Sequence, residues 1–403
     1  MTPSAAEHER PEETTPPSTI ARLGHKLRTE AASPARQAAA IGVGFLIGCS
    51  PFFGLHLPLS LFAGWLFGLN RLKIYVAANI SNPLVSPFLL FAEIQVGSWL
   101  KTGSFYPISV ETLRELDIWD FAGDLLLGSA TVGLGMGALG ALATYAFVSQ
   151  SRLEPAVGLL LEKSAERYLS SGLLAWEFAH SKLRYDPVYR EILREGMLPE
   201  TGTFFDLGCG RGLLLAALTE ARSQYEAGEW PDGWPAPPRL RLVGIETQAR
   251  AAKIAQTALG EGAEIDNKDL TTAELPVCHA TALIDVLHYL QPEDQHALLH
   301  RLAETMLPRG VLLIREANAD GGRLFFFVRA SERLRALLRG HWRQRFSYRS
   351  TRDWAALLEL AGFSARWENM GQGTPFANVL LRADRKPTMA SAALIDKSGM
   401  ETR

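Results

Sequence analysis

The sequence predicts two domains of different fold class. The first is an all-α, membrane-associated domain, and the second is an α/β domain with an open seven-stranded sheet and helices on both faces. Three observations support this division. The chain has 403 residues, which is more than one domain core usually contains. Charged residues are nearly absent from three long stretches of the first 150 residues. From about residue 153, short apolar runs alternate with segments of helical spacing.

The overall composition excludes several classes of protein. The 41 Lys and Arg residues nearly balance the 43 Asp and Glu residues, so no global positive field is available for nucleic acid, and no nucleic-acid partner is expected. The three cysteines, Cys49, Cys209 and Cys278, lie far apart without a CxxC pair. A disulfide scaffold and a metal site are therefore not expected.

The two ends of the chain differ from the rest. Residues 1–20 are rich in Pro, Thr and Glu and have few large apolar side chains, so we expect a disordered leader that is not a secretory signal. Residues 385–403 are expected to form a disordered tail. The predicted domains are then residues 21–152 and residues 153–384.

The first charge-free stretch predicts a helical hairpin that enters a membrane. Between Arg36 and Arg71 lie 34 residues whose only ionisable side chains are Cys49 and His56. This is long for one membrane span and short for two. The segment 50–54 (SPFFG) lies in its middle and is expected to break the helix there.

Two further stretches support a membrane location. Nineteen uncharged residues separate Lys73 from Glu93, and 27 separate Asp124 from Arg152. A helix over residues 125–148 is long enough to span, and its GxxxG spacing at Gly133 and Gly137 suits close helix contact. The alternative is a soluble, glycine-rich helical core, but soluble cores seldom run this far without a charge.

The distribution of charges predicts the orientation of this domain. Basic residues flank both ends of the hairpin, whereas the loop over residues 101–124 is net acidic. The excess of positive charge on cytoplasmic loops then places the N-terminus and the second domain in the cytoplasm and residues 101–124 outside.

The segment 48–56 (GCSPFFGLH) and the segment 79–83 (NISNP) make residues 20–150 resemble a bacterial membrane-associated domain family of unknown function. The resemblance implies a location at the bacterial inner membrane and no activity. His56, Asn79 and Asn82 either line a polar path or bond to backbone groups freed by the prolines.

A glycine-rich turn follows the first apolar run of the second domain. The run is residues 203–207 (TFFDL), and Gly208, Gly210 and Gly212 come next, before LLLAALTEA at helical spacing. Glycines in a strand–turn–helix allow positive φ and let a ligand approach the backbone. A dinucleotide fingerprint would need a glycine where Leu213 stands, and the GK[ST] of a P-loop is absent.

Acidic residues follow the next three predicted strands. Glu246 ends the run that begins at residue 239, Asp269 follows a strand near 263–266, and Asp285 ends the run from residue 280. Without the Pro- and Trp-rich insertion over 223–239, which is expected to be a surface loop, Glu246 lies about 20 residues after Gly208, as expected for an acid that binds ribose hydroxyls. Further strands are expected at 310–316, 363–369 and 376–382. Because ligands bind at the carboxyl ends of strands in such sheets, these residues should converge.

Residues 200–383 resemble class I S-adenosylmethionine-dependent methyltransferases. Asp206 to Gly212 (DLGCGRG) matches the first motif, Glu246 the second, Asp269 the third and Asp285 to Tyr289 the fourth. The resemblance implies a Rossmann-like sheet and S-adenosyl-L-methionine as cofactor. It also implies that the glycines face the methionine end, Glu246 binds the ribose, Asp269 meets the adenine amino group, and Asp206 organises the loop and the cofactor ammonium. Gly212 and Asp285 complete the predicted cofactor-binding set.

The acceptor is less well defined. If it is a hydroxyl or a phenol carbon, a base must hold or remove a proton, and His288 and Glu316 are the candidates. The alternatives are that His288 packs at the strand end and that Glu316 pairs with Arg315 or a neighbour.

Segments on both sides of the motifs are expected to shape the acceptor pocket. Residues 176–189 resemble a lid helix and the turn after it. Residues 323–349 mix aromatics with arginines, where related enzymes carry a substrate cap. Short phrases such as Asp186 to Tyr189 also resemble methyltransferases of aryl polyene pigment clusters.

We therefore expect a membrane-tethered methyltransferase that acts at the cytoplasmic face on a hydrophobic, aromatic small molecule, such as an aryl polyene head group. A quinone or lipid precursor is the alternative acceptor. A different alternative is a membrane transporter or scaffold with a cofactor-sensing second domain. The oligomeric state is left open.

Overall fold

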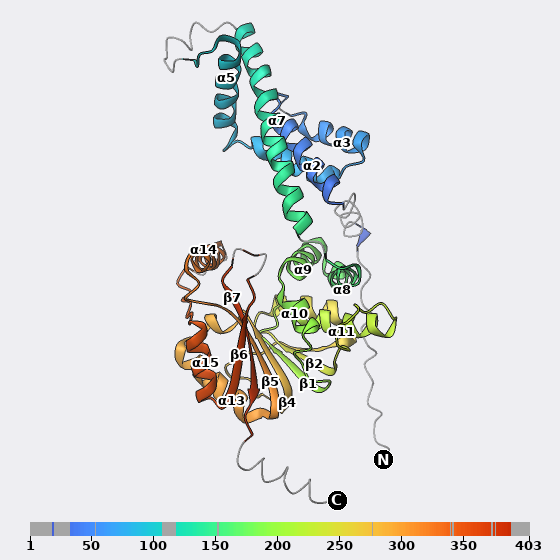
Figure 1. Ribbon diagram of the computed structural model, residues 1–403, viewed down its shortest axis with the longest axis vertical. Helices are drawn as coiled ribbons and strands as arrows, with labels where there is room; N and C mark the ends of the chain where they lie inside the picture. Colours follow the sequence, from blue (N-terminus) through green and yellow to red (C-terminus); the bar gives the residue numbers. More distant parts are fainter. Residues whose placement is uncertain are drawn as a thin grey trace, which may run out of the picture. The chain divides into compact units, whose positions relative to one another are not determined.

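The structure, a computed structural model, describes residues 18–19, 33–52, 54–106, 118–150, 153–275, 277–338, 340, 342–371, 374 and 376–387 (Figure 1). The chain divides into two compact units whose boundary lies between Arg152 and Leu153. The predicted leader falls almost wholly outside the described residues, and so does the predicted tail from residue 388 onward. Arg385, placed in the tail by the sequence, instead ends the last strand.

All regular elements described in the first unit are helices. Its elements are α2 (Pro34–Gly48), α3 (His56–Phe67), α4 (Arg71–Ala78), the 3-10 turn η1 (Asn79–Ser81), α5 (Ser86–Thr102) and α7 (Ile118–Gln150). The expected break of the first apolar stretch is present, because α2 ends at Gly48 and α3 begins at His56. The predicted spanning helix also forms, and it begins earlier than expected. Asp124 consequently lies within α7 rather than in a loop, and residues 107–117 of that predicted loop lie outside the described residues.

Small residues bring the helices of this unit close together. A Cβ built on Gly137 of α7 would lie 2.8 Å from the carbonyl oxygen of Gly42 in α2, and one on Gly133 would meet Cys49 and Leu46. Gly128 similarly contacts the backbone of Glu93 in α5. Larger side chains at these positions would force the helices apart, so the GxxxG spacing has the packing role predicted for it.

The polar residues near the prolines mostly bond locally. The Asn79 side chain donates to the Tyr75 carbonyl at 2.7 Å, and the Asn82 Oδ1 accepts from the Leu84 amide at 3.0 Å. The His56 ring lies 3.5 Å from the Ser50 carbonyl oxygen and from Ser81 Oγ. These contacts satisfy backbone groups at the helix breaks, which is the second of the two roles expected for these residues.

The second unit contains one seven-stranded sheet, as predicted. Its strands are β1 (Thr201–Leu207), β2 (Arg239–Ile245), β3 (Glu264–Asp266), β4 (Cys278–Ile284), β5 (Met306–Ala317), β6 (Phe363–Asn369) and β7 (Asn378–Arg385). The strand order is β3-β2-β1-β4-β5-β7-β6, and β7 runs antiparallel to its neighbours β5 and β6. The order reverses between β1 and β4, so the turns that follow these strands flank a crevice.

Helices cover both faces of the sheet (Figure 1). One face packs against α8 (Pro155–Glu166), η2 (Arg167–Ser171), α9 (Leu173–Tyr185), α10 (Val188–Arg194), α11 (Leu213–Glu226) and α12 (Ala249–Leu259). The other face packs against α13 (Pro292–Thr305) and α15 (Thr351–Leu360). The remaining elements are η3 (Gly260–Gly262), η4 (Leu287–Tyr289) and α14 (Gly322–Leu338). Phe204 and Phe205 show the alternation, since they enter opposite cores.

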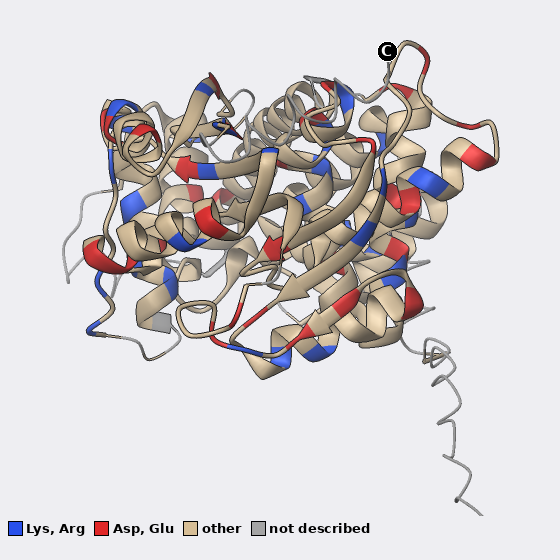
Figure 2. Cartoon of the chain, turned by 90° about the horizontal axis from the view of Figure 1, so that it is seen from below, with Lys and Arg blue, Asp and Glu red and all other residues tan. Residues whose placement is uncertain are grey.

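The insertion over residues 223–239 differs from the expected surface loop. Its first four residues extend α11 to Glu226. Trp230 and Trp234 lie edge to face, 5.7 Å apart, and pack against the core beneath them. Basic and acidic residues are interspersed over the helices and strands in the view of Figure 2, so no large region of one sign is seen there.

Candidate functional site

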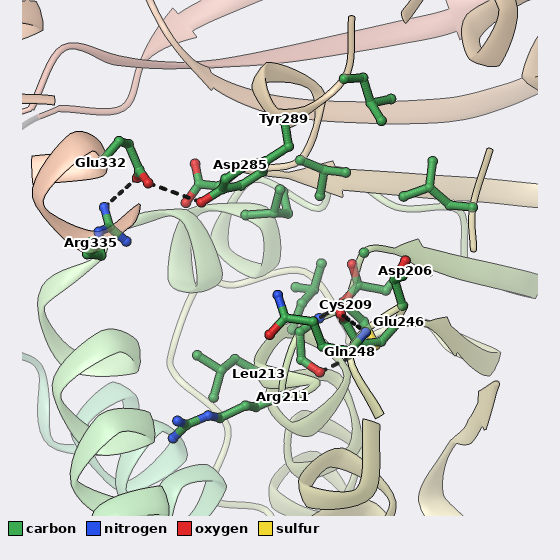
Figure 3. A pocket seen from close by; sticks show the side chains of 18 of the residues that line it. Asp206, Cys209, Arg211, Leu213, Glu246, Gln248, Asp285, Tyr289, Glu332 and Arg335 are labelled. Atoms are coloured by element: carbon green, nitrogen blue, oxygen red, sulfur yellow. Dashed lines mark hydrogen bonds and ion pairs between the residues drawn. The ribbon is translucent and has the colours of Figure 1, made fainter. Parts of the chain in front are cut away.

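A cavity of about 560 Å³ opens at the carboxyl ends of β1, β2 and β4 (Figure 3). Six of the residues predicted to bind a cofactor line it together: Asp206, Gly208, Gly210, Glu246, Asp269 and Asp285. They come from turns that are up to 79 residues apart in the sequence, and the sheet order places these turns side by side. The predicted convergence is therefore present in the structure.

The glycine turn after β1 leaves room for a ligand at one position in particular. Gly210 has φ +57°, and a Cβ built on it would meet nothing within 4 Å, because it would project into open space. Gly208 has φ +71° and packs against Val286. The backbone of this turn is therefore uncovered at Gly210, where a ligand can approach it.

Gly212, which was also predicted to bind the cofactor, has different surroundings from Gly208 and Gly210. Gly212 is not among the described residues that line the cavity. A Cβ at this position would lie 2.8 Å from Leu259 and 3.2 Å from Ala255. Gly212 thus allows α11 to pack closely on α12, which is a structural role that a motif cannot distinguish from ligand contact.

Glu246 ties the end of β2 to the glycine turn. Its Oε2 accepts a hydrogen bond from the Gly210 amide at 2.8 Å, and its Oε1 accepts one from the Gln248 amide at 2.7 Å. The side chain is buried yet lines the cavity. A carboxylate held in this way presents its remaining acceptor sites in a fixed direction, as recognition of a pair of hydroxyls requires.

Replacement of Glu246 by alanine should weaken binding of S-adenosylmethionine, the cofactor expected from the sequence, by about 1.5–3 kcal/mol, because charge-assisted hydrogen bonds are lost. Titration calorimetry of the full chain in detergent measures this. Glu264→Ala is the matched control, since Glu264 lies on the adjacent strand in an exposed pair with Arg241. Equal affinities for the two variants would contradict the role of Glu246.

Asp206 and Asp269 have different surroundings. Burial, and then the charge of Glu246, raises the pKa of Asp206 from 3.8 to about 7. Asp269 is exposed, and its Oδ1 accepts hydrogen bonds from the amide and hydroxyl of Thr271, which lower its pKa. Among the described residues, no cation neutralises the buried carboxyl of Asp206, and a cationic ligand would supply one.

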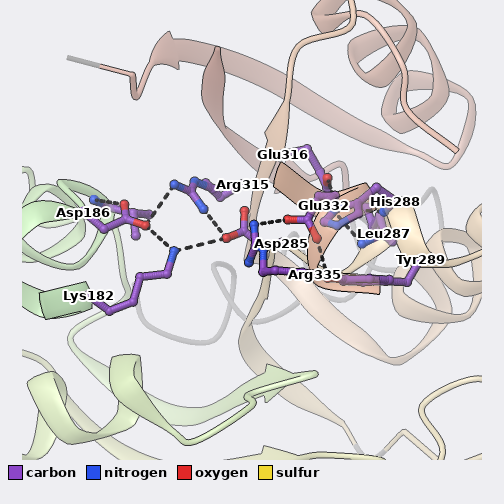
Figure 4. A network of polar contacts seen from close by, with 11 residues as sticks. Lys182, Asp186, Asp285, Leu287, His288, Tyr289, Arg315, Glu316, Glu332 and Arg335 are labelled. Carbon is purple, nitrogen blue, oxygen red and sulfur yellow. Dashed lines mark hydrogen bonds and ion pairs between the residues drawn. The ribbon is translucent and has the colours of Figure 1, made fainter. Parts of the chain in front are cut away.

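Asp285 belongs to a network of charges that joins three elements (Figure 4). Arg315 of β5 is buried and pairs with Asp285 and, at 2.9 Å, with Asp186. Lys182 of α9 lies 2.6 Å from Asp186 and 3.5 Å from Asp285. Burial opposes ionisation of Asp285, but the charges of Arg315 and Lys182 outweigh it and lower its pKa to about 2.

The backbone at Asp285 is strained as well. Its φ is +58°, a conformation that non-glycine residues rarely adopt. Such strain persists where surrounding contacts fix it, and it clusters at functional sites.

His288 and Glu316, the two residues predicted as bases, lie together but do not line the cavity in the described part of the chain. The two side chains are 2.7 Å apart, and Glu316 also accepts hydrogen bonds from the amides of Leu287 and His288. Both residues are buried. The pair therefore holds the turn η4, whose last residue Tyr289 does line the cavity. This placement favours a positioning role for the pair over direct acid–base contact.

Replacement of Glu316 by glutamine should lower the free energy of unfolding by about 1–3 kcal/mol, because a buried pair loses its charge. Burial opposes protonation of His288, but the Glu316 carboxylate outweighs it and raises the pKa above 6.5. The pair therefore stabilises the fold fully below pH 6.5, and that stability is lost as the pH rises through the raised pKa.

The difference in stability between wild type and Glu316→Gln should accordingly be largest in acid and shrink toward alkaline pH, as measured by urea unfolding between pH 5.5 and pH 9. Glu264→Gln in the exposed pair serves as the control and should show little effect at any pH. A difference for Glu316→Gln that does not depend on pH would contradict the coupling.

The side of the cavity opposite Asp206 and Glu246 is formed by Tyr289, which ends the fourth motif, and by residues that lie outside every motif (Figure 3). Glu332 of α14 accepts a hydrogen bond from Tyr289 Oη at 3.0 Å and pairs with Arg335. Phe346 lies 5.7 Å from the Tyr289 ring. This end of the cavity therefore combines aromatic surface with two opposite charges. The mixed composition of residues 323–349 was the only signal for it in the sequence.

Two family models match different parts of this chain. Residues 176–366 match a family model described as a methyltransferase domain, and residues 18–154 match one described as an uncharacterized protein conserved in bacteria.

Among solved structures, the chain is similar to magnesium protoporphyrin IX methyltransferase from Synechocystis with bound SAH, at 19% identity, over 52% of this chain and 88% of that one, with a TM-score of 0.35. It is also similar to a SAM-dependent methyltransferase from Thermotoga maritima, at 15% identity, over 57% and 100%, with a TM-score of 0.36. A third similarity is to a SAM-dependent methyltransferase from Methanosarcina mazei, at 13% identity, over 48% and 96%, with a TM-score of 0.34.

The second unit is therefore a methyltransferase domain with the predicted fold, and the first unit contains the bacterial domain of uncharacterised function. The expectation of a methyltransferase is confirmed at this level.

Proposed function

We propose that this protein is anchored in the bacterial inner membrane and transfers a methyl group from S-adenosylmethionine to a hydrophobic, aromatic small molecule at the cytoplasmic face. The observation that supports the proposal most strongly is that two different sides border the same cavity. One wall consists of the glycine turn with Asp206 and Glu246, and the other of Tyr289 and Phe346 beside Glu332.

The residues present suit the cofactor. The uncovered backbone at Gly210 gives space for its methionine end. No cation pairs with the buried Asp206 in the described part of the chain, and a ligand ammonium or sulfonium would provide one. Glu246 would hold the ribose hydroxyls, and Asp269 with Leu270 and Thr271 would border the adenine. When bound, S-adenosylmethionine supplies a methyl group already activated for transfer by its sulfonium.

The protein's own contribution is then alignment and control of protons. Tyr289 and Phe346 offer ring surface for an aromatic acceptor. Glu332 holds the Tyr289 hydroxyl and can accept a proton from a hydroxyl acceptor beside it. Asp285 is a poor base because its pKa lies near 2, so we assign it to orientation. His288 and Glu316 position η4.

Features of the helical unit support membrane anchoring. Residues Phe121–Ser149 form a helix long and apolar enough to cross a membrane, with mean hydropathy 1.7 and only 22% of its most apolar window buried. The pair Arg71–Ser81 and Ser86–Thr102, bent by 80°, qualifies as a broken span. Large apolar residues of this unit, such as Trp65, Phe88 and Leu139, are 67–76% exposed. Apolar surface of this extent suits contact with lipid.

Mass spectrometry of lipid extracts tests the acceptor. Cells that contain the protein should show a hydrophobic aromatic compound that is heavier by one CH2 group than in cells that lack it, and the Gly210→Val variant should not restore the product. A product of quinone or lipid-precursor type would favour the alternative acceptors. Binding of S-adenosylmethionine without any methylated product would favour a scaffold or transporter with a cofactor-sensing domain.

A further inference from the structure

Helix α14 has two faces with different surroundings. Val328, Glu332 and Ala336 follow one another at intervals of four residues and are buried, and Glu332 and Ala336 line the cavity. Phe325 packs edge to face on Tyr348, with ring centres 5.1 Å apart. The inner face of this helix is therefore part of the acceptor side of the site.

The outer face of the same helix carries large apolar side chains in contact with solvent. Phe326 is 68% exposed, Phe327 55% and Leu334 57%, and Trp342 just beyond the helix is 68% exposed. The surface of a soluble protein seldom has four such residues within 17 positions. Burial of these side chains against another apolar surface would lower the free energy. This face is unpartnered among the described residues.

The charges on the outer face have one sign. Arg323, Arg329 and Arg333 are exposed, and the only acidic residue of α14, Glu332, lies on the buried face. Arginines beside aromatic and aliphatic side chains are typical of helices that lie in the interface of an anionic lipid layer, because the ring surface enters the acyl boundary while the guanidinium groups meet phosphates. A second copy of this chain would bring the same positive charge against itself, so it fits this face less well.

We infer that the outer face of α14, together with Trp342, docks on an anionic bilayer surface, and that the acceptor enters the cavity from that lipid layer beneath α14. This inference rests on the proposed membrane anchoring and extends it, because the methyltransferase domain itself contacts lipid. α9 flanks the same cavity through Phe178 and Lys182, and Leu174, one turn earlier, is 85% exposed. The apolar surface thus continues on both sides of the opening.

Photo-crosslinking in the full chain tests this contact. The phenylalanine analogue p-benzoylphenylalanine replaces Phe326 in one sample, Leu139 of α7 in a second and Leu360 of α15 in a third, after reconstitution into vesicles of phosphatidylethanolamine and phosphatidylglycerol. Leu360 is a matched control because it is 76% exposed but lies on a helix that does not line the cavity. Positions 326 and 139 should both crosslink to lipid, and position 360 should not.

The outcomes separate the two proposals. Crosslinking at 139 but not at 326 overturns the docking of α14 and leaves membrane anchoring intact. Absence at both positions overturns anchoring as well. A crosslinked dimer through position 326 would identify a second copy as the partner and overturn the lipid surface.

The charge requirement has its own test. The double variant Arg323→Glu, Arg329→Glu should lower the lipid crosslinking at position 326 by about tenfold, since two interfacial charges are reversed. Its affinity for S-adenosylmethionine should be unchanged, because neither arginine lines the cavity. Equal crosslinking in the double variant and in wild type would overturn recognition of an anionic surface.

Discussion

Replacement of Gly210 by valine should abolish measurable binding of S-adenosylmethionine, with a loss of at least about 100-fold in affinity. Two effects combine. The side chain would fill the open space beside the turn, which a Cβ at this position enters without meeting any protein atom within 4 Å. A β-branched residue also strains a backbone with φ +57°, and this would disturb the amide that donates to Glu246.

The backbone effect and the steric effect can be separated. Gly228 has φ +72°, and a Cβ there likewise meets nothing within 4 Å, but it lies at the end of α11 away from the cavity. Gly228→Val should therefore carry a similar conformational cost and keep normal affinity. Titration calorimetry of both variants, with thermal unfolding to verify folding, decides the matter. Normal affinity in folded Gly210→Val would remove the glycine turn from the site.

Replacement of Asp206 by asparagine should weaken binding strongly while it stabilises the protein without ligand. The pKa of Asp206 is raised to about 7, so the folded state resists ionisation of this carboxyl, and stability is lost as the pH rises from 3.8 through 7. Asparagine removes that cost. At pH 8 the free energy of unfolding should rise by about 2 kcal/mol, whereas affinity for the cofactor should fall by about tenfold or more because the cation loses its partner.

The same residue should make binding depend on pH. Below pH 7 a cationic ligand must displace a proton from Asp206, so affinity should fall by about tenfold per pH unit toward acid and level off above pH 7. Calorimetry in two buffers with different heats of ionisation would detect the released proton at pH 6. Asp206→Asn should show neither the release nor the slope. A wild-type affinity that is flat between pH 6 and pH 8 would contradict an unpaired Asp206.

The cofactor side of the site could be predicted because its information is local. Each cofactor-binding acid lies at or just after the end of one strand, and the glycine turn and its acid are recognisable from a few consecutive residues. The same locality leaves side-chain direction open at two predicted residues. Gly212 belongs to the first motif but packs against α12, and His288 lies within the fourth motif but is not among the described residues that line the cavity. A motif specifies which residues occur and not the direction of each side chain.

The acceptor side could not be predicted in the same way. Glu332 and Arg335 reach the cavity only because the packing of Phe325 on Tyr348 and the burial of Val328 set the rotation of α14. The pairing of Arg315 with Asp186 joins residues that are 129 positions apart. Such contacts depend on how distant segments pack together, and the hydrophobic pattern of a single segment does not predict that packing.

The charge cluster around Arg315 limits where the acceptor can enter the cavity and where the product can leave it. Arg315 is 3% exposed, so moving the α9–α10 corner away from β5 would strand a buried guanidinium or carboxylate. Breaking such a pair costs about 3–5 kcal/mol, which limits spontaneous opening on that flank to roughly one molecule in a hundred or fewer. That side of the cavity should therefore stay closed. The acceptor should enter and the methylated product should leave by the opposite side, so the product must leave before the next acceptor can bind.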